Sequence, residues 1–132
     1  MKKKLYLAGP MSGYPNHNFA AFNRAAAKLR AEGYYVFNPA ENELPAKFEQ
    51  GDLFKNGGCP PELYRQLLTD DINFILKEAD AIALLPGWTK SKGARAEHAV
   101  SVAIGLEVIF LDTNDNVRLS YAAGDEQAAL YA

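Results

Sequence analysis

The sequence has 132 residues but only one cysteine, Cys59, and two histidines. A single thiol excludes an internal disulfide and any cysteine-rich metal site. No group of His, Cys and Asp residues has the spacing of metal ligands, so no metal is expected. A reducing cytoplasm is the expected compartment, because proteins that depend on disulfides are secreted.

Neither sign of charge dominates, since 14 basic residues face 16 acidic ones for a net charge of -2. This balance argues against a nucleic-acid groove or an anionic membrane surface as the main partner. No apolar run approaches the length of a membrane span. The run at residues 5–8, which follows Met-Lys-Lys-Lys, is too short for the core of a signal peptide. Small-molecule ligands suit this composition better.

Short apolar runs alternate with segments of helical period, which predicts one α/β domain over residues 1–132 with a parallel sheet. Strands are expected at residues 5–8, 34–37, 81–85 and 107–111. Helices are expected between an Asn18 cap and Gly33, from Pro61 onward, and over residues 93–104. Residues 38–60 are a long loop or lid with at most one helical turn, and the tail at 113–132 has room for a strand or helix near 117–121.

The expected inward faces of the last two helices are Leu63, Tyr64, Leu67, Leu68, Ile72, Ile75 and Leu76, and Ala96, Ala99, Val100 and Ala103. Asp71 falls on the first of these stripes. A carboxylate on an apolar face is costly unless it is paired, which favours a functional role over the alternative of a capping or interface aspartate.

Residues 86–97 join the third strand to the third helix through a loop that is glycine-bearing, hydroxylated and cationic. Ser91 and Gly93, beside Lys90 and Lys92, suit a phosphate at a helix N-terminus. Glu97 follows one turn later, and the helix dipole is expected to keep it ionised. The pattern indicates a nucleotide site with its own nucleophile or base, and a surface turn with solvated lysines explains it equally well.

Further candidates follow the first and third strands, because ligands bind beyond the carboxyl ends of an open parallel sheet. Tyr6 is either a site hydroxyl or a core aromatic, Trp88 either stacks on a base or packs, and His17 lies in a nearby loop. Small residues after the first strand, which let a ligand approach the backbone, are Gly9, Pro10, Ser12 and Gly13. Asp71 and Glu97 facing one pocket would suit chemistry at an anomeric carbon.

Three segments in order resemble the nucleoside 2-deoxyribosyltransferase superfamily. They are Tyr6-Leu7-Ala8-Gly9-Pro10, Asp71-Ile72 leading to residues 79–83, and Ser91-Lys92-Gly93 followed by Ala96-Glu97. The resemblance covers residues 4–112. The first thirty residues, with Asn18-Phe19, look most like a branch of small proteins frequent in phages and prophages.

The resemblance implies a flavodoxin-like, doubly wound parallel sheet of four or five strands, a homodimer or higher homo-oligomer, and cleavage of an N-glycosidic bond without a cofactor. It implies that Glu97 is the nucleophile, that Asp71 assists at the sugar or base, and that Tyr6 orients the nucleophile. Ser91 resembles the serine of 2'-deoxynucleoside 5'-monophosphate N-glycosidases at a position where the transferases of free nucleosides often have aspartate. Ser12 departs from those hydrolases, which commonly have arginine there.

The leading hypothesis is therefore cleavage or base exchange on (deoxy)nucleoside 5'-monophosphates through a glutamate nucleophile. The expected substrate-binding residues are Gly9, Pro10, Ser12, Gly13, Asn18, Trp88, Ser91 and Gly93. A non-catalytic nucleotide-binding sensor or sponge, and a hydrolase of NAD or cyclic ADP-ribose nucleotides, are the alternatives.

Overall fold

The structure is a computed structural model that describes residues 2–44, 47–49, 51 and 59–122. Its strands are β1 (Lys4–Ala8), β2 (Tyr35–Phe37), β3 (Ala81–Leu84), β4 (Glu107–Leu111) and β5 (Val117–Tyr121). Its α-helices are α1 (Phe19–Ala31), α2 (Pro61–Lys77) and α3 (Lys92–Ala103), and 3-10 turns lie at Pro15–Asn18, Pro39–Glu41 and Trp88–Lys90.

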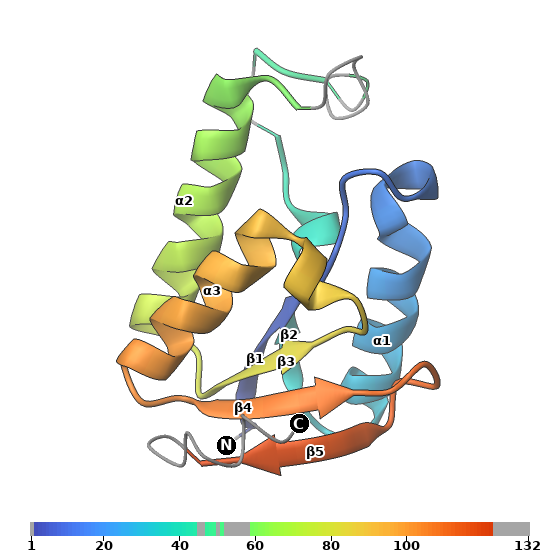
Figure 1. The fold of residues 1–132 in the computed structure, drawn as a ribbon, viewed down its shortest axis with the longest axis vertical. Helices are drawn as coiled ribbons and strands as arrows, with labels where there is room; N and C mark the ends of the chain where they lie inside the picture. The colour runs from blue at the N-terminus through green and yellow to red at the C-terminus, as the bar shows by residue number, and fades with distance from the viewer. Residues whose placement is uncertain (1, 45–46, 50, 52–58, 123–132) are drawn as a thin grey trace.

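The five strands form one sheet in the order β2-β1-β3-β4-β5 (Figure 1). β1 pairs in parallel with β2 and β3, and β3 pairs in parallel with β4. β5 is an antiparallel edge strand beside β4, which decides between the strand and the helix expected near residues 117–121. This strand order, with helices on both faces, is flavodoxin-like. The predicted α/β fold is therefore confirmed.

Side chains of β1 alternate between two hydrophobic clusters, as the period of two in a strand requires. Leu5 and Leu7 pack with α1 on one face of the sheet. Tyr6 and Ala8 pack with residues of α2 and α3 on the other face. Figure 1 shows the same layers, with α1 on one side of the sheet and α2 and α3 on the other. Tyr6 therefore points toward the two helices that carry Asp71 and Glu97.

Several predicted helix ends are confirmed by their local geometry. Pro61 occupies the first position of α2, and Gly33, just past the end of α1, has a φ of 101° that glycine adopts without strain. Asn18 occupies the predicted N-cap position of α1, but its side chain makes no capping hydrogen bond. Its φ is 60°, and its amide nitrogen instead donates to the carbonyl oxygen of Pro10 at 2.8 Å. The left-handed backbone at Asn18 turns its side chain toward the loop after β1.

The inward face predicted for α2 is partly wrong. Tyr64 and Leu76 are 38% and 51% exposed, whereas Leu63, Asp71, Phe74 and Ile75 are buried. The apolar stripe of α2 is wider than the face that the sheet covers, so its outer members reach solvent.

The inward face predicted for α3 is also partly wrong, since Ala99 and Ala103 are exposed. The buried residues of α3 are Ala94, Glu97 and Ser101. Alanines spread around a helix give little hydrophobic contrast between its faces. The orientation of α3 instead places the Glu97 carboxyl against Tyr6.

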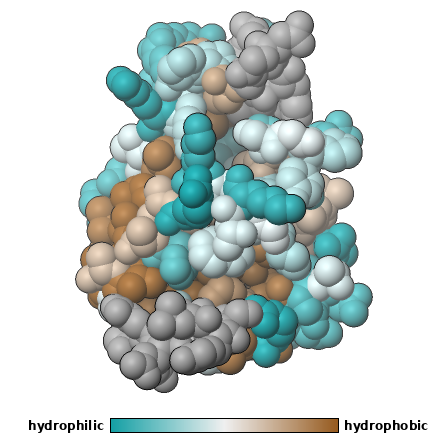
Figure 2. Space-filling view, viewed as in Figure 1, coloured by the Kyte–Doolittle hydropathy of each residue, from teal (hydrophilic) through white to brown (hydrophobic). Residues whose placement is uncertain are grey.

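In the described part of the chain, no helix is both long and apolar enough to cross a membrane. Figure 2 shows polar side chains over much of one face and hydrophobic ones gathered on the side where α2 and α3 end. Large hydrophobic residues on these ends include Leu76, 51% exposed, and Ile104, 44% exposed.

Candidate active site

Tyr6 is held rigidly in the middle of the sheet. It lies in register with Phe37 of β2 and Ile82 of β3, and its side chain is 1% exposed. Its ring stacks on Phe37 with centroids 5.5 Å apart and contacts Phe74 at 6.4 Å. The packed ring aims the phenolic hydroxyl at α3, where it donates to Oε2 of Glu97 at 2.7 Å.

Two buried carboxyl groups meet above this hydroxyl. Asp71 is 8% exposed and Glu97 is 6% exposed. The amide nitrogen of Asn42 donates to Oδ1 of Asp71 at 3.0 Å. Glu97 and Asp71 lie close enough that each shifts the pKa of the other. Because α2 and α3 pack side by side, residues 26 positions apart in the sequence form one polar cluster.

Burial and mutual repulsion set the protonation of this cluster. Burial, followed by the nearby charge of Asp71, raises the pKa of Glu97 well above its usual value. Burial raises the pKa of Asp71 to about 6, and hydrogen bonds from Asn42, Tyr6 and Glu97 oppose that rise. Both shifts favour the protonated forms, so the pair keeps a proton to higher pH than two separate carboxyl groups would.

The raised pKa of Glu97 opposes the expectation that the helix dipole keeps this carboxyl group ionised. Glu97 is the sixth residue of α3, which begins at Lys92, and the dipole acts mainly on the first turn. Burial and the neighbouring Asp71 outweigh the dipole at this depth. Burial, followed by the nearby charges of Glu97 and Asp71, raises the pKa of Tyr6, so its hydroxyl stays protonated and remains a donor.

A cavity of about 710 Å³ opens beside the carboxyl groups, beyond the carboxyl ends of β1 and β3. Such a position, between the strands where the sheet order reverses, is where open α/β sheets bind ligands. Predicted site residues that line it are Tyr6, Gly9, Pro10, Ser12, Asp71, Ser91, Gly93 and Glu97. The loop residues His17, Lys90 and Lys92 line it as well.

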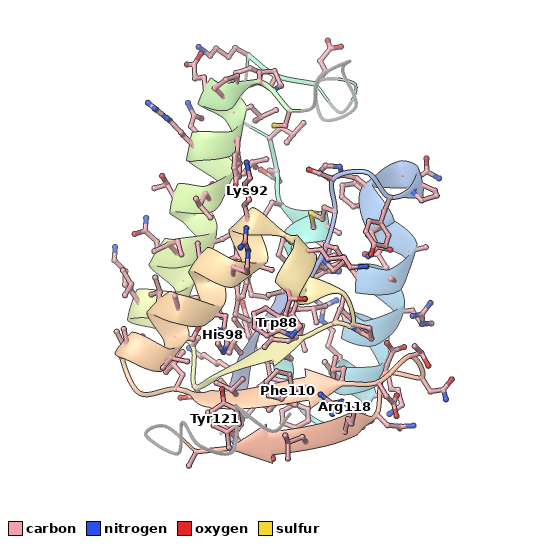
Figure 3. The ribbon with its side chains drawn as sticks, viewed as in Figure 1. Trp88, Lys92, His98, Phe110, Arg118 and Tyr121 are labelled. Carbon is pink, nitrogen blue, oxygen red and sulfur yellow. The ribbon has the colours of Figure 1, made fainter. Side chains whose placement is uncertain are left out.

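Three predicted site residues lie outside this lining. Gly13 has a φ of 84° and serves the turn after β1, and Asn18 bonds to the Pro10 carbonyl. The ring of Trp88 packs on His98 at 4.6 Å and lies 6.1 Å from Phe110. Figure 3 shows Trp88 beside His98 and close to β4, away from Lys92 at the start of α3. Trp88 therefore packs against neighbouring side chains and is not placed to stack on a base in the cavity.

Ser91 is the N-cap of α3, which begins at Lys92, one residue before the predicted start. The hydroxyl oxygen of Ser91 accepts from the backbone N–H of Ala94 at 3.1 Å. A Cβ at Gly93 would lie 3.2 Å from the Tyr64 hydroxyl oxygen, so glycine leaves room for that side chain. At Gly9 a Cβ would lie 2.8 Å from the Cβ of Leu85, so this glycine is needed for packing as much as for access to the cavity.

Two residues of the cluster were missed by sequence reasoning. Tyr64 lines the cavity two helical turns before Asp71, and its place on the same stripe is the signal that could have identified it. Asn42 had no such signal, because residues 38–60 show no period.

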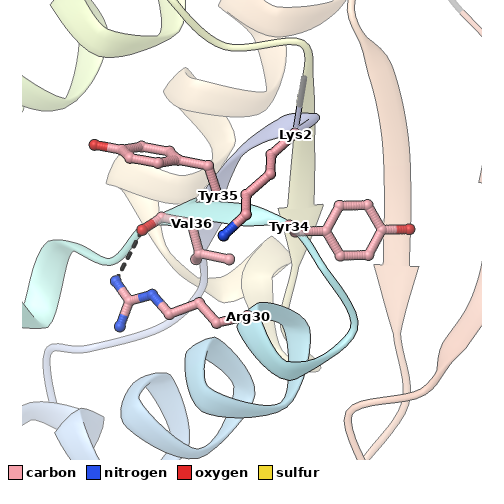
Figure 4. Close-up of a pocket in the computed structure, with 5 residues that line it drawn as sticks. All are labelled: Lys2, Arg30, Tyr34, Tyr35 and Val36. Carbon is pink, nitrogen blue, oxygen red and sulfur yellow. Dashed lines mark hydrogen bonds between the residues drawn. The ribbon is translucent and has the colours of Figure 1, made fainter.

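A second cavity, of about 280 Å³, lies near the amino ends of β1 and β2 (Figure 4). Arg30 and Lys2 bring positive charge to it. The Arg30 guanidinium donates to both carboxylate oxygens of Glu41, at 2.8 and 2.6 Å, and to the Val36 carbonyl oxygen at 2.9 Å. The charge of Arg30 in this cavity is therefore balanced by Glu41.

Within the described residues, no group of three or more His, Cys, Asp and Glu side chains is arranged to hold a metal ion. No curated protein matches the chain significantly. The profile of one family, described as "Domain of unknown function (DUF4406)", matches residues 3–110. That match covers most of the chain, which therefore belongs to the DUF4406 family.

Proposed function

We propose that this protein cleaves the N-glycosidic bond of (deoxy)nucleoside 5'-monophosphates, with Glu97 as the nucleophile. The observation that carries the proposal is the buried cluster in which Tyr6 donates to Glu97 at 2.7 Å beside Asp71, on the wall of a nucleotide-sized cavity. Two carboxyl groups sharing one proton offer both a nucleophile and an acid for a leaving group.

In the proposed first step, the shared proton passes from Glu97 to Asp71. The Glu97 carboxylate then attacks C1' of the sugar, the C1'–N bond breaks, and Asp71 gives its proton to the departing base. Tyr6 holds Oε2 of Glu97 in place, so attack falls to the other carboxylate oxygen. The result is a glycosyl ester on Glu97 and a neutral free base.

In the second step, water attacks C1' while the Asp71 carboxylate accepts a proton from the water. The ester bond to Glu97 breaks, and the cluster returns with one proton shared between its carboxyl groups. Attack by the nitrogen of an incoming base in place of water would give base exchange. Every proton in this sequence is supplied by Glu97, Asp71 or water, so the proposed reaction uses no cofactor.

The 5'-phosphate is the proposed partner of the loop before α3. Lys90, Ser91 and Lys92 line the cavity there, at the positive end of the helix dipole. The Ser91 oxygen already accepts from Ala94, which leaves its hydroxyl proton to be donated to a phosphate oxygen. Two lysines add favourable charge.

We also propose that the chain is related to the nucleoside 2-deoxyribosyltransferase superfamily, in its phage and prophage branch, and works as a homo-oligomer in the cytoplasm. The exposed Leu76 and Ile104 side chains support self-association. Light scattering after size-exclusion chromatography tests it, and a monomer at micromolar concentration would contradict it.

The function is tested by incubating the protein with nucleoside 5'-monophosphates and with NAD, and detecting free base by chromatography. We expect base release from monophosphates by the wild type and none by Glu97→Gln. Tight binding without product would favour the nucleotide sensor, and release of nicotinamide alone would favour the NAD hydrolase.

A further inference from the structure

The segment that follows β2 is anchored firmly to the rest of the fold. Asn38 is 3% exposed, and its amide nitrogen donates to Oδ1 of Asn23 on α1 at 2.9 Å. Its amide oxygen accepts from the backbone N–H of Ala40 at 3.0 Å and caps the 3-10 turn Pro39–Glu41. Glu41 is then held by both terminal nitrogens of Arg30. These bonds fix the direction in which the next residue leaves the turn.

That next residue is Asn42, whose amide nitrogen donates to Oδ1 of Asp71 at 3.0 Å. An ionised carboxylate can only accept hydrogen bonds, so a fixed donor stabilises the ionised form of Asp71 over the protonated form. The anchored turn therefore biases the two carboxyl groups, although Asn42 itself is absent from the cavity lining.

We propose that Asn42 is a positioning residue that keeps Asp71 ionised and thereby holds the shared proton of the Asp71–Glu97 pair on Glu97. This inference deepens the proposed function and rests on it only for its kinetic consequence. Asp71 must be ionised in the second step, when it accepts a proton from the water that attacks C1'. Asn42 would thus set the lower end of the pH range in which the cluster can react.

Other charged and titratable groups also face Asp71 or its cavity. They are Tyr6 from β1, Glu97 from α3, Asp70 and Tyr64 from α2, and Tyr14, His17, Cys59, Lys90 and Lys92 on the cavity wall. Tyr6 and Glu97 also lower the pKa of Asp71, whereas Asp70 raises it. Both Tyr6 and Glu97 belong to the proposed reaction. Among the described groups, Asn42 is the donor to Asp71 that can be removed without changing a proposed catalytic group.

The test is direct titration of the carboxyl groups by ¹³C NMR, with the Asp71 signal identified by its loss in Asp71→Asn. In Asn42→Ala we expect the Asp71 midpoint to rise by about one pH unit, the size expected for a hydrogen bond to a charged group. Asn42→Asp, which keeps the size of the side chain and adds a negative charge, should raise the midpoint further.

Glu32→Gln is the control, because it removes an exposed carboxylate that pairs with Lys28 on α1 and leaves the turn Pro39–Glu41 and the Asn42 amide in place. Its Asp71 midpoint should match the wild type. An unchanged midpoint in both Asn42 variants, or an equal shift in Glu32→Gln, would overturn the role of Asn42.

Base release against pH supplies the kinetic readout. Asn42→Ala should lose rate most at low pH and recover toward the wild-type rate near pH 8, whereas a uniform loss at every pH would mean a structural role and overturn the inference. If the wild type releases no base, the proposed glycosidase activity is rejected, and the NMR titration still decides the role of Asn42. If the wild type releases base but the Asp71 midpoint is unchanged in the Asn42 variants, the role of Asn42 is rejected and the proposed glycosidase activity is retained.

Discussion

The phenolic oxygen of Tyr6 lies 2.7 Å from Oε2 of Glu97, joining the centre of the sheet to the buried face of α3. The Tyr6 ring is fixed by Phe37 and Phe74, so the hydroxyl cannot swing away from the carboxyl group. A fixed donor lets Glu97 keep one orientation through proton transfer and attack, without a reorganisation cost at each turnover.

Tyr6→Phe should therefore lower kcat by about 10- to 100-fold, the equivalent of one hydrogen bond to a charged group. The melting temperature should change little, because the substituted ring still packs on Phe37 and Phe74. Tyr35→Phe is the control, since Tyr35 is 50% exposed and lies outside the lining of the larger cavity beside Glu97. A loss of melting temperature with kcat intact would make Tyr6 a packing residue only.

Glu97→Ala should remove base release while the fold remains. The Glu97 carboxyl group is buried, and burial makes its ionised form unfavourable. Its removal leaves a small cavity, which is destabilising, but also removes the free-energy cost of burying a polar group. Chromatographic detection of free base and a thermal melt check the two halves of this expectation. Glu78→Ala, on an exposed glutamate, should keep full activity. Substantial turnover by folded Glu97→Ala would rule out Glu97 as the nucleophile.

The fold could be predicted because its signals are local and repeated. Apolar runs such as residues 107–111 coincide with β4, and Pro61 marks the start of α2. Asp71 could be placed on a buried face from helical period alone. These features depend on neighbours within one or two turns, which a sequence displays directly.

The remaining parts of the site depend on contacts between distant segments. Asn42 reaches Asp71 only because Asn38 and Glu41 anchor its turn, and the aperiodic sequence at 38–60 does not encode that path visibly. Trp88 follows β3 as expected but turns toward His98. The raised pKa of Glu97 likewise follows from burial and then from the proximity of Asp71, which neither helix reveals alone.

Asp71→Asn should reduce base release by orders of magnitude and also change how stability depends on pH. Burial raises the pKa of Asp71 from 3.8 to about 6, so the folded protein binds more protons than the unfolded chain between these values. Stability must then fall as the pH rises from about 4 to about 6, by about 3 kcal/mol for a shift of this size.

Asp71→Asn has no proton to lose there, so its curve should be flatter and its stability at pH 7 no lower than that of the wild type. Urea unfolding from pH 4 to pH 7 measures both curves. Parallel curves for the two proteins would contradict the raised pKa, and a large drop in stability at every pH would make Asp71 a structural residue.

The wild type should prefer 5'-monophosphates over the matching nucleosides by at least about tenfold in kcat/KM, because two charge-assisted hydrogen bonds to phosphate are worth roughly 1.5–3 kcal/mol each. The donors are the Ser91 hydroxyl and the backbone N–H groups near Gly93, with Lys90 and Lys92 beside them.

Ser91→Asp keeps an N-cap for α3 but places a negative charge against the phosphate. It should therefore compress or invert the preference while leaving turnover of free nucleosides in place. Ser91→Asn caps the helix without that charge and controls for the cap itself. Steady-state kinetics on one nucleoside and its monophosphate test this prediction. Equal kcat/KM for the two substrates in the wild type would mean that the loop before α3 does not bind phosphate.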